Sequence, residues 1–369
     1  MLKHLPNIFV LDALSEREMI SGLEEIVLDL GTRPRALVRG IGKVYLCDDE
    51  EVLVTRYHIN CVVGKFVHDG TIDTNNRTGF DGLLHSVGVM RDKNGTIYAV
   101  TIRVRGFVKG VSDAIDDLLF NPTQGVRTPS APSILVLGGR ASGKTTLMRD
   151  VCRKLSFFEN VLIVDTRNDI GGDAVIPHRR AIGESRRIMV PSNASQDSVM
   201  RQGFRNHNPQ TMVIDEISSQ EDIKACHEMK TRGVRVIAGA VGTIPSILDS
   251  PLLGRSLGGL VQDASDSEEE DDSTSTGETK KDKRAADPLF DAVIEVEGGR
   301  QPMWTVVNAV AKVVDELLAN GSVAKPDRRT PLPPGAILQE AETEGCERAD
   351  GCTGFMLKVK PDKDSKWLW

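Results

Sequence analysis

The chain has 369 residues, with 40 % hydrophobic and 4 % aromatic side chains and a net charge of −7, so it can build two or three domains with largely aliphatic cores. The scarcity of aromatic rings argues against a stacking platform for single-stranded nucleic acid. No apolar run approaches the roughly 18 residues of a membrane-spanning helix, so we expect no membrane span. The six cysteines form no C-x-x-C pair, which is typical of reduced thiols.

The N-terminal third has the pattern of a small α+β domain. Ser15 and Glu18 form a capping box, S-x-x-E, which predicts a helix that begins at the residue after Ser15. Residues 83–91 and 96–105 are rich in β-forming side chains and are separated by an Asn-Gly pair, which accepts the positive φ of a hairpin turn. We therefore expect a helix and a β-hairpin in this domain.

Further along the chain, short apolar runs alternate with helical stretches. These runs are residues 134–137, 161–165, 212–215 and 234–240. Continuous apolar strands separated by helices imply an α/β fold, in which helices cover both faces of a parallel sheet.

These changes of pattern divide the chain into four segments. They are an N-terminal α+β domain at residues 1–120, a linker at 121–132, an α/β core at 133–320 and a C-terminal tail at 321–369. Within the core, residues 262–287 form a low-complexity insertion that is first acidic and then basic. Such a segment cannot bury enough apolar surface to order itself, so it is either a solvated surface loop or a docking or regulatory segment.

One motif carries most of the chemistry. The sequence Gly138-Gly139-Arg140-Ala141-Ser142-Gly143-Lys144-Thr145 matches the phosphate-binding pattern G-x-x-x-x-G-K-[ST] in full, after a predicted strand and before a predicted helix. Its glycines allow successive N–H groups to point at one anion, and the helix N-terminus adds a favourable dipole. We expect this P-loop, with Thr146, to bind ATP. Lys144 should reach the β- and γ-phosphates, and the Thr145 hydroxyl should ligate Mg²⁺.

A pair of acids forms the second candidate, because the apolar run after the P-loop helix ends in Asp215-Glu216. We expect Asp215 to hold the Mg²⁺ and Glu216 to polarise the attacking water as general base. The alternative is a strand that ends in ordinary surface acids. No N-K-x-D stretch is present to read guanine, and neither L-S-G-G-Q nor H-E-x-x-H occurs. ATP hydrolysis by water is therefore the expected reaction, and no zinc site is expected.

Polar and glycine residues follow the run at residues 161–165, at the sheet edge where open α/β folds bind ligands. Asp169 in this loop either assists Glu216, lines the Mg²⁺ site or belongs to an ordinary polar loop. More arginines follow than one ATP site would use, which favours a shared interface in which one arginine reaches a neighbour's γ-phosphate. These are Arg179, Arg180, Arg186 and Arg187.

The run at residues 234–240 should lie beside the strand that ends in Asp215. Its tip offers no polar side chain from Gly239 to Gly242, and Thr243 is the first hydroxyl. We therefore expect Thr243 to be the γ-phosphate sensor and hydrolysis to be slow, because a hydroxyl is a weaker donor than a protonated imidazole.

These motifs resemble those of the plastid-conserved P-loop ATPases related to bacterial stage III sporulation protein AA, the seedling-plastid-development type. The resemblance covers roughly residues 10–320. It rests on residues 25–31, 33–34, 53–56, 76–79 and 84–91, the P-loop, and residues 164–166, 169–173, 176–178, 186–187, 206–207, 209 and 288–295. The chain departs from the family in two places. The family usually has Glu where Asp169 stands, and a Thr-Ala-His-Gly stretch where this chain has residues 238–242.

The resemblance implies a RecA-like or AAA-type ATPase core of the secretion-motor kind, a homo-oligomeric ring and a plastid location, with the cytoplasm as the alternative. We expect a Mg²⁺-dependent ATPase whose N-terminal domain presents a surface to an unknown protein partner. Two alternatives stay open. One is a nucleotide-gated scaffold with little turnover. The other is a nucleic-acid motor, which would need a basic groove on residues 1–130, where 15 Lys and Arg stand against 17 Asp and Glu.

Overall fold

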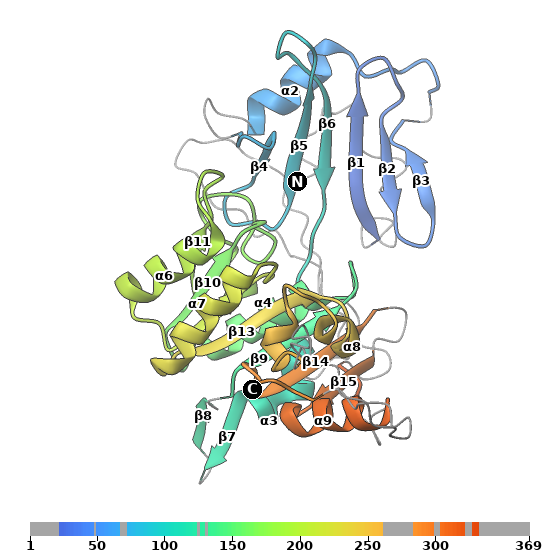
Figure 1. Ribbon diagram of the computed structural model, residues 1–369. Coiled ribbons are helices and arrows are strands. Elements are labelled where there is room, and N and C mark those ends of the chain that lie inside the picture. Colours follow the sequence, from blue (N-terminus) through green and yellow to red (C-terminus); the bar gives the residue numbers. More distant parts are fainter. Residues whose placement is uncertain are drawn as a thin grey trace, which may run out of the picture. The chain divides into compact units, whose positions relative to one another are not determined.

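The computed structural model describes residues 22–47, 49–66, 72–123, 126–129, 132–260, 283–298, 303–321 and 327–331 (Figure 1). The chain forms two compact units. Unit 1 contains residues 1–107, 172–175 and 338–369, and unit 2 contains residues 108–171 and 176–337. The helix expected to begin after Ser15 lies outside the described residues, as does the insertion from residue 261 to residue 282.

Unit 1 is built on a six-stranded antiparallel sheet in the order β3-β2-β1-β6-β5-β4. The strands are β1 (Leu23–Asp29), β2 (Arg35–Val38), β3 (Gly42–Tyr45), β4 (Arg77–Gly79), β5 (Ser86–Arg91) and β6 (Ile97–Arg103), with one described helix, α2 (Arg56–Phe66). Apolar side chains alternate along the central strands, so Ile26, Leu28, Val100 and Ile102 form one core with Ile59 of α2. The predicted hairpin is confirmed by the pairing of β5 with β6.

Unit 2 contains an eight-stranded mixed sheet in the order β11-β10-β12-β13-β9-β14-β15-β16. Six neighbouring strands are parallel, and β15 and β16 extend the edge beside β14 as antiparallel strands. The strands are β9 (Ile134–Gly138), β10 (Val161–Asp165), β11 (Arg186–Met189), β12 (Thr211–Ile214), β13 (Arg235–Val241), β14 (Ala292–Glu297), β15 (Met303–Val307) and β16 (Asp327–Arg329). The expected parallel sheet is thus confirmed. One edge of it carries two antiparallel strands that we did not expect.

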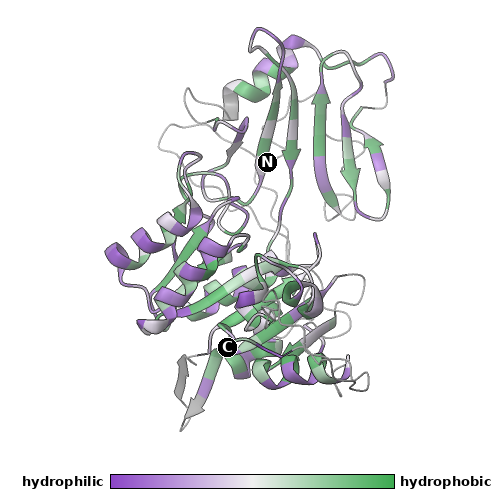
Figure 2. Ribbon diagram, in the orientation of Figure 1, coloured by the Kyte–Doolittle hydropathy of each residue, from purple (hydrophilic) through white to green (hydrophobic). Residues whose placement is uncertain are grey.

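Helices cover both faces of this sheet, whose central strands are apolar along their length (Figure 2). One core joins the sheet to α6 (Gln196–His207), α7 (Gln220–Thr231), α8 (Ile244–Leu248) and α9 (Val310–Asn320). The P-loop helix α4 (Lys144–Leu155) contacts β9, β10, α5 (Arg179–Ile182) and the short helix η3 (Val111–Ile115). This layering keeps both faces of the strands dry, as their continuous apolar sequences require.

The units divide earlier than the sequence pattern indicated. Residues 108–120, which we assigned to the N-terminal domain, belong to unit 2 because η3 is anchored to α4. The buried Asp150 carboxylate accepts hydrogen bonds from the Ser112 amide at 2.9 Å and the Ser112 hydroxyl at 2.6 Å. Among the described residues no helix is long and apolar enough to span a membrane.

Two other segments also differ from the expected division. After α3 (Asp116–Leu119), the expected linker contains a two-stranded sheet of β7 (Phe120–Thr123) and β8 (Val126–Pro129). The expected tail contributes β16 to the core sheet, where Arg329 pairs with Asp117 through two nitrogens. These pairings join residues that are far apart in sequence, which local composition does not encode.

Candidate active site

The P-loop connects β9 to α4 through a tightly curled backbone. Gly138 and Gly143 have φ angles of 155° and 103°, and Ala141 has φ of 58°. A Cβ built on Gly138 would lie 2.6 Å from both the Val296 carbonyl oxygen and the Ser142 Oγ, so this position requires glycine. Curling of this kind turns backbone N–H groups toward a common point, which is how such loops bind phosphate.

Lys144 closes the loop on itself. Its Nζ donates to the carbonyl oxygens of Gly138 and Gly139, both at 2.7 Å. Burial, together with the nearby charge of Arg167, lowers the pKa of Lys144, whereas the charges of Glu216 and Asp215 act to raise it. The Lys144 ammonium thus lies within electrostatic reach of the two acids predicted for metal binding and catalysis.

The acids lie at the same edge of the sheet. β12 runs between β10 and β13, so Asp215 and Glu216 emerge next to the loop that follows Asp165. Burial, and then the charge of Asp165, raise the pKa of Asp215 to about 7, against the lowering effect of Arg167. This Asp is nearly enclosed, with a side chain 2 % exposed. Asp215 is therefore buried, unlike an ordinary surface acid.

Arg167 is a site residue that we did not single out from the sequence. Its Nη2 lies 2.5 Å from Glu216 Oε2, and its Nε lies 3.4 Å from Asp215 Oδ2 and 3.7 Å from Asp169 Oδ2. The guanidinium therefore joins the three acids predicted for metal binding and catalysis. The sequence did contain a signal for it, because Arg167 is a cation in the polar loop after β10. That loop lies at the sheet edge where β12 also ends.

The loop that carries Arg167 and Asp169 is shaped by Asp165, the last residue of β10. Its buried carboxylate accepts from the Ile170 amide at 3.2 Å and the Gly171 amide at 2.7 Å. From α4, the buried Arg149 donates through Nε to the Ile170 carbonyl at 3.1 Å and through Nη2 to the Asp169 carbonyl. The P-loop helix and this loop are thus fastened together.

Gln196, at the start of α6, braces the two acidic loops. Its Nε2 donates to the Glu216 carbonyl at 2.9 Å, and its Oε1 accepts from the Thr166 hydroxyl. One amide side chain therefore links the Thr166 hydroxyl, next to Arg167, to the backbone of the predicted base. Sequence reasoning missed it, because its partners come from two other strands.

The strand with the predicted sensor lies as expected, between β12 and β9, with Val241 opposite Gly138. Thr243 begins α8 as its N-cap, where its hydroxyl accepts from the Ser246 amide at 3.5 Å and its amide donates to Ser246 Oγ at 2.7 Å. The hydroxyl thus has a structural partner, and Thr243 lies beside the first half of the P-loop.

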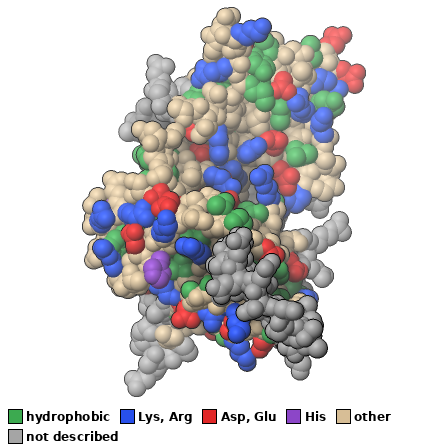
Figure 3. Space-filling view, viewed as in Figure 1, with side chains coloured by type: hydrophobic (Ala, Val, Ile, Leu, Met, Phe, Trp, Pro, Cys, Tyr) green, Lys and Arg blue, Asp and Glu red, His purple; other side chains and the backbone are tan. Residues whose placement is uncertain are grey.

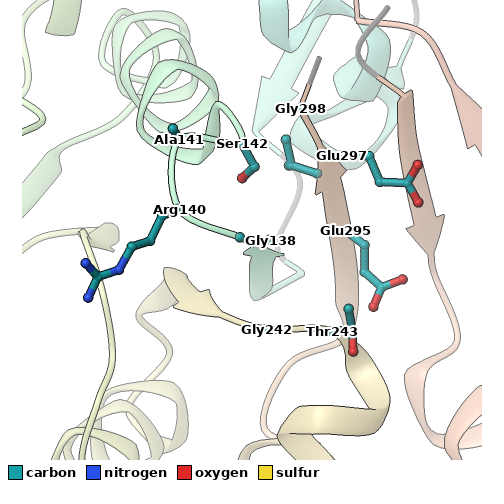
Figure 4. Close-up of a pocket in the computed structure, with 11 residues that line it drawn as sticks. Gly138, Arg140, Ala141, Ser142, Gly242, Thr243, Glu295, Glu297 and Gly298 are labelled. Carbon is teal, nitrogen blue, oxygen red and sulfur yellow. The ribbon is translucent and has the colours of Figure 1, made fainter.

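A hollow of about 460 Å³ borders this side of the P-loop. Its lining consists of residues 138–142, Gly242, Thr243 and residues 295–298 at the end of β14. The Glu295 and Glu297 side chains point away from the loop (Figure 4), and Glu295 accepts from the Ile244 amide at 2.6 Å. Among the described residues the buried Ser142 Oγ has no hydrogen-bond partner.

The described residues contain no group of three or more His, Cys, Asp or Glu side chains arranged to hold a metal ion by themselves. The oxygens of Thr145 and Asp215 nevertheless match the mixed hydroxyl, carboxylate and phosphate ligation of Mg²⁺ in P-loop proteins. In those sites the nucleotide supplies part of the coordination shell. The donor set therefore fits a metal that arrives with a nucleotide.

Comparisons with known proteins are consistent with this geometry. The family model described as sporulation stage III, protein AA, matches residues 13–257. An uncharacterized ycf45 protein of Porphyra purpurea is 33 % identical over 321 residues, covering 86 % of this chain and 53 % of the relative. The SEEDLING PLASTID DEVELOPMENT 1 protein of Arabidopsis thaliana is 35 % identical over 250 residues, covering 67 % of this chain and 34 % of that protein. The chain thus spans about half and a third of these two relatives.

Among solved structures, the pilus retraction motor PilT with bound ADP superposes with a TM-score of 0.52. Its sequence is 13 % identical, and the match covers 83 % of this chain and 84 % of that one. A similarity at this level of identity shows the fold, which is RecA-like with a P-loop and a smaller sheet-containing domain before it.

Proposed function

The chain belongs to the sporulation stage III, protein AA family, and from that premise we propose that it is a Mg²⁺-dependent ATPase that couples hydrolysis to conformational change in a homo-oligomeric ring. The observation that carries this proposal is the meeting of Lys144, Asp215, Glu216 and Asp169 around the open end of one parallel sheet. Such an edge, next to a P-loop, is where α/β folds bind nucleotides.

Different residues of this chain would bind the phosphates, the nucleoside and the metal. The backbone of residues 138–146 would hold the phosphates, and Lys144 would exchange its two carbonyl partners for β- and γ-phosphate oxygens. The hollow beside residues 138–142 would receive the nucleoside, because the carboxylates there point away from the loop. Thr145 and Asp215 would hold Mg²⁺, which supplies charge neutralisation at the phosphates.

Glu216 is the proposed general base, since it directly follows the metal-binding Asp215 and keeps its side chain 25 % exposed to water. Asp169 belongs to the same cluster and would orient the attacking water or the metal's water ligands. Gln196 and Arg149 hold the backbone of both acidic loops, and Thr243 remains a proposed sensor. Acids placed in this way fit hydrolysis better than transfer to a second substrate.

A specific observation supports one alternative, a nucleotide-gated scaffold that binds ATP with little turnover. Glu216 is ion-paired with Arg167, and an ion-paired carboxylate is a weaker base. The tip of β13 also lacks a polar side chain. The nucleic-acid motor has less support. Basic side chains on the visible surface of unit 1 stand among acidic ones (Figure 3), and Arg35 and Arg103 pair with Asp29 and Glu25.

The proposed location and partners rest on similarity to known proteins alone. The name of the Arabidopsis relative, SEEDLING PLASTID DEVELOPMENT 1, supports a plastid location. The pilus retraction motor of the same fold, which binds ADP, supports a nucleotide-driven motor, and the ring and the unknown protein partner are proposed from the family resemblance. The proposal is tested by phosphate release from purified protein and from Lys144→Ala, each with and without DNA. Turnover that is lost in the variant supports the ATPase, and unchanged turnover would disprove the site. Tight ATP binding without phosphate release would favour the scaffold.

A further inference from the structure

The three acids of the site all contact one half-exposed cation. Arg167 reaches Asp215, Glu216 and Asp169 from the loop after β10, and its own side chain is 49 % exposed. Lys144, which interacts electrostatically with Glu216 and Asp215, donates its hydrogen bonds to two P-loop carbonyls. Arg167 is therefore placed to balance the charge of all three acids.

The geometry favours exchange over a permanent ion pair. Only the contact to Glu216 is short, at 2.5 Å, whereas those to Asp215 and Asp169 are 3.4 Å and 3.7 Å and none forms a two-pronged guanidinium–carboxylate pair. A half-exposed arginine loses little when it returns to water. The nearly enclosed Asp215, in contrast, cannot remain charged without a cation nearby.

A divalent metal would need the same oxygens. Mg²⁺ takes oxygen ligands at about 2.1 Å in near-octahedral geometry, and a guanidinium on the same carboxylate face obstructs that shell. When two cations compete for the same carboxylates, the binding of one lowers the apparent affinity of the other.

We propose that Arg167 is an exchangeable counter-cation, which occupies the Asp215, Glu216 and Asp169 cluster in the nucleotide-free chain and leaves when a divalent metal enters with the nucleotide. This inference rests on the proposed ATPase site and adds its regulation. Arg167 keeps the carboxylates balanced and Glu216 paired until metal and nucleotide are both present. Its release then frees the base at the moment when a γ-phosphate is in place.

The test measures metal binding without nucleotide, with Mn²⁺ as the probe and electron paramagnetic resonance as the readout of free ion. Arg167→Gln should bind Mn²⁺ about tenfold or more tightly than the wild-type chain, a coupling of the usual size between two ligands. The matched control is Arg201→Gln, because Arg201 also bridges two acids, Asp197 and Glu228, on α6 and α7. That control should leave Mn²⁺ affinity unchanged.

Adding Asp215→Asn to Arg167→Gln should abolish the gain, which locates the new metal at this cluster. Equal Mn²⁺ affinity in wild type and Arg167→Gln would overturn the proposal. A lower melting temperature in Arg167→Gln without any gain in Mn²⁺ affinity would do the same, since it indicates a purely structural pair. If Arg167→Gln does not fold, Arg167→Lys carries the test. It keeps the charge but loses the planar fork, so its Mn²⁺ affinity should exceed that of the wild type by a smaller factor.

Failure of the ATPase proposal would be visible separately. Fluorescent ATP-analogue binding to the wild-type chain, with Lys144→Ala as its negative control, reports the nucleotide site alone. A chain that binds no nucleotide but gains Mn²⁺ affinity in Arg167→Gln would disprove the ATPase while retaining the counter-cation. A chain that binds nucleotide but shows no gain in Mn²⁺ affinity in Arg167→Gln would disprove the counter-cation while retaining the nucleotide site.

Discussion

Gly239 packs directly against the backbone of Asp215. A Cβ built on Gly239 would lie 2.2 Å from the Asp215 carbonyl oxygen and 3.2 Å from the sulfur of Met148 on the P-loop helix. The Gly239 carbonyl also accepts from the Ile217 amide at 2.8 Å. The position of the proposed metal-binding acid therefore depends on a strand residue without a side chain.

Gly239→Ala should displace the backbone that carries Asp215 and Glu216. We expect the free energy of unfolding to fall by about 1–3 kcal/mol, which is the usual cost of overpacking, and the melting temperature to fall with it. We also expect a loss of most ATPase activity, because the two acids are displaced. Thermal unfolding and phosphate release measure the two effects. Gly88→Ala is the control, since a Cβ there meets only the Thr101 carbonyl at 4.0 Å. Wild-type behaviour of Gly239→Ala would mean that the two strands separate easily.

Glu216→Gln should bind Mg-ATP and fail to hydrolyse it, because the amide cannot accept the proton of the attacking water. It also loses the charge that Arg167 contacts at 2.5 Å, so Mg-ATP binding should be as tight as in wild type or tighter. Size-exclusion chromatography with ATP should show accumulated oligomer. Normal turnover in this variant would assign the base elsewhere, with Asp169 as the next candidate.

The stability of the nucleotide-free chain should depend on the protonation of Asp215. Its pKa is raised from 3.8 to about 7, so the folded chain keeps a proton that the unfolded chain loses. The resulting stabilisation is present below pH 3.8 and is lost as the pH rises through about 7. Between about pH 4 and pH 7 the melting temperature should therefore fall, and it should level off above pH 7. Mn²⁺ affinity should rise over the same range because the metal needs the charged carboxylate.

Asp215→Asn isolates this contribution. The variant should show a smaller fall in melting temperature over the same pH range and should be more stable than wild type at the upper end. Some dependence should persist, because burial also raises the pKa of the neighbouring Asp165. An identical pH profile in both proteins would contradict the assignment of the raised pKa to Asp215.

Thr243 has two separable roles to test. As the N-cap of α8, Thr243→Ala should cost about 1 kcal/mol of stability, and Thr243→Ser should restore it. As the proposed sensor, the hydroxyl should matter mainly in the transition state, so Thr243→Ala should lower kcat more than it raises KM. Val241→His, at the tip of β13, should raise kcat if this position corresponds to the family's histidine. A loss of stability with unchanged kcat in Thr243→Ala would leave only the cap.

Much of the core was predictable because its signals are local. The four apolar runs correspond to β9, β10, β12 and β13 within a few residues, since buried parallel strands need continuous apolar sequence. The hairpin of β5 and β6 followed from an Asn-Gly turn. The antiparallel edge of β15 and β16, and the assignment of residues 108–120 to unit 2, were not predictable in this way. They depend on contacts such as that between Ser112 and Asp150, which are 38 positions apart.

The sequence by itself determined the phosphate-binding loop, because every group that forms the loop comes from consecutive residues. Glycines allow the backbone of these residues to turn, and the next residues begin a helix. It also determined the family and the identity of the acidic pair after β12. Only the tertiary structure decided what faces that pair. Arg167 meets Asp215 and Glu216 because β10 and β12 are neighbours in the sheet, and Gly239 supports them because β13 is the next strand. Strand order is set by the packing of the whole core, so no local pattern could have placed that cation on those acids.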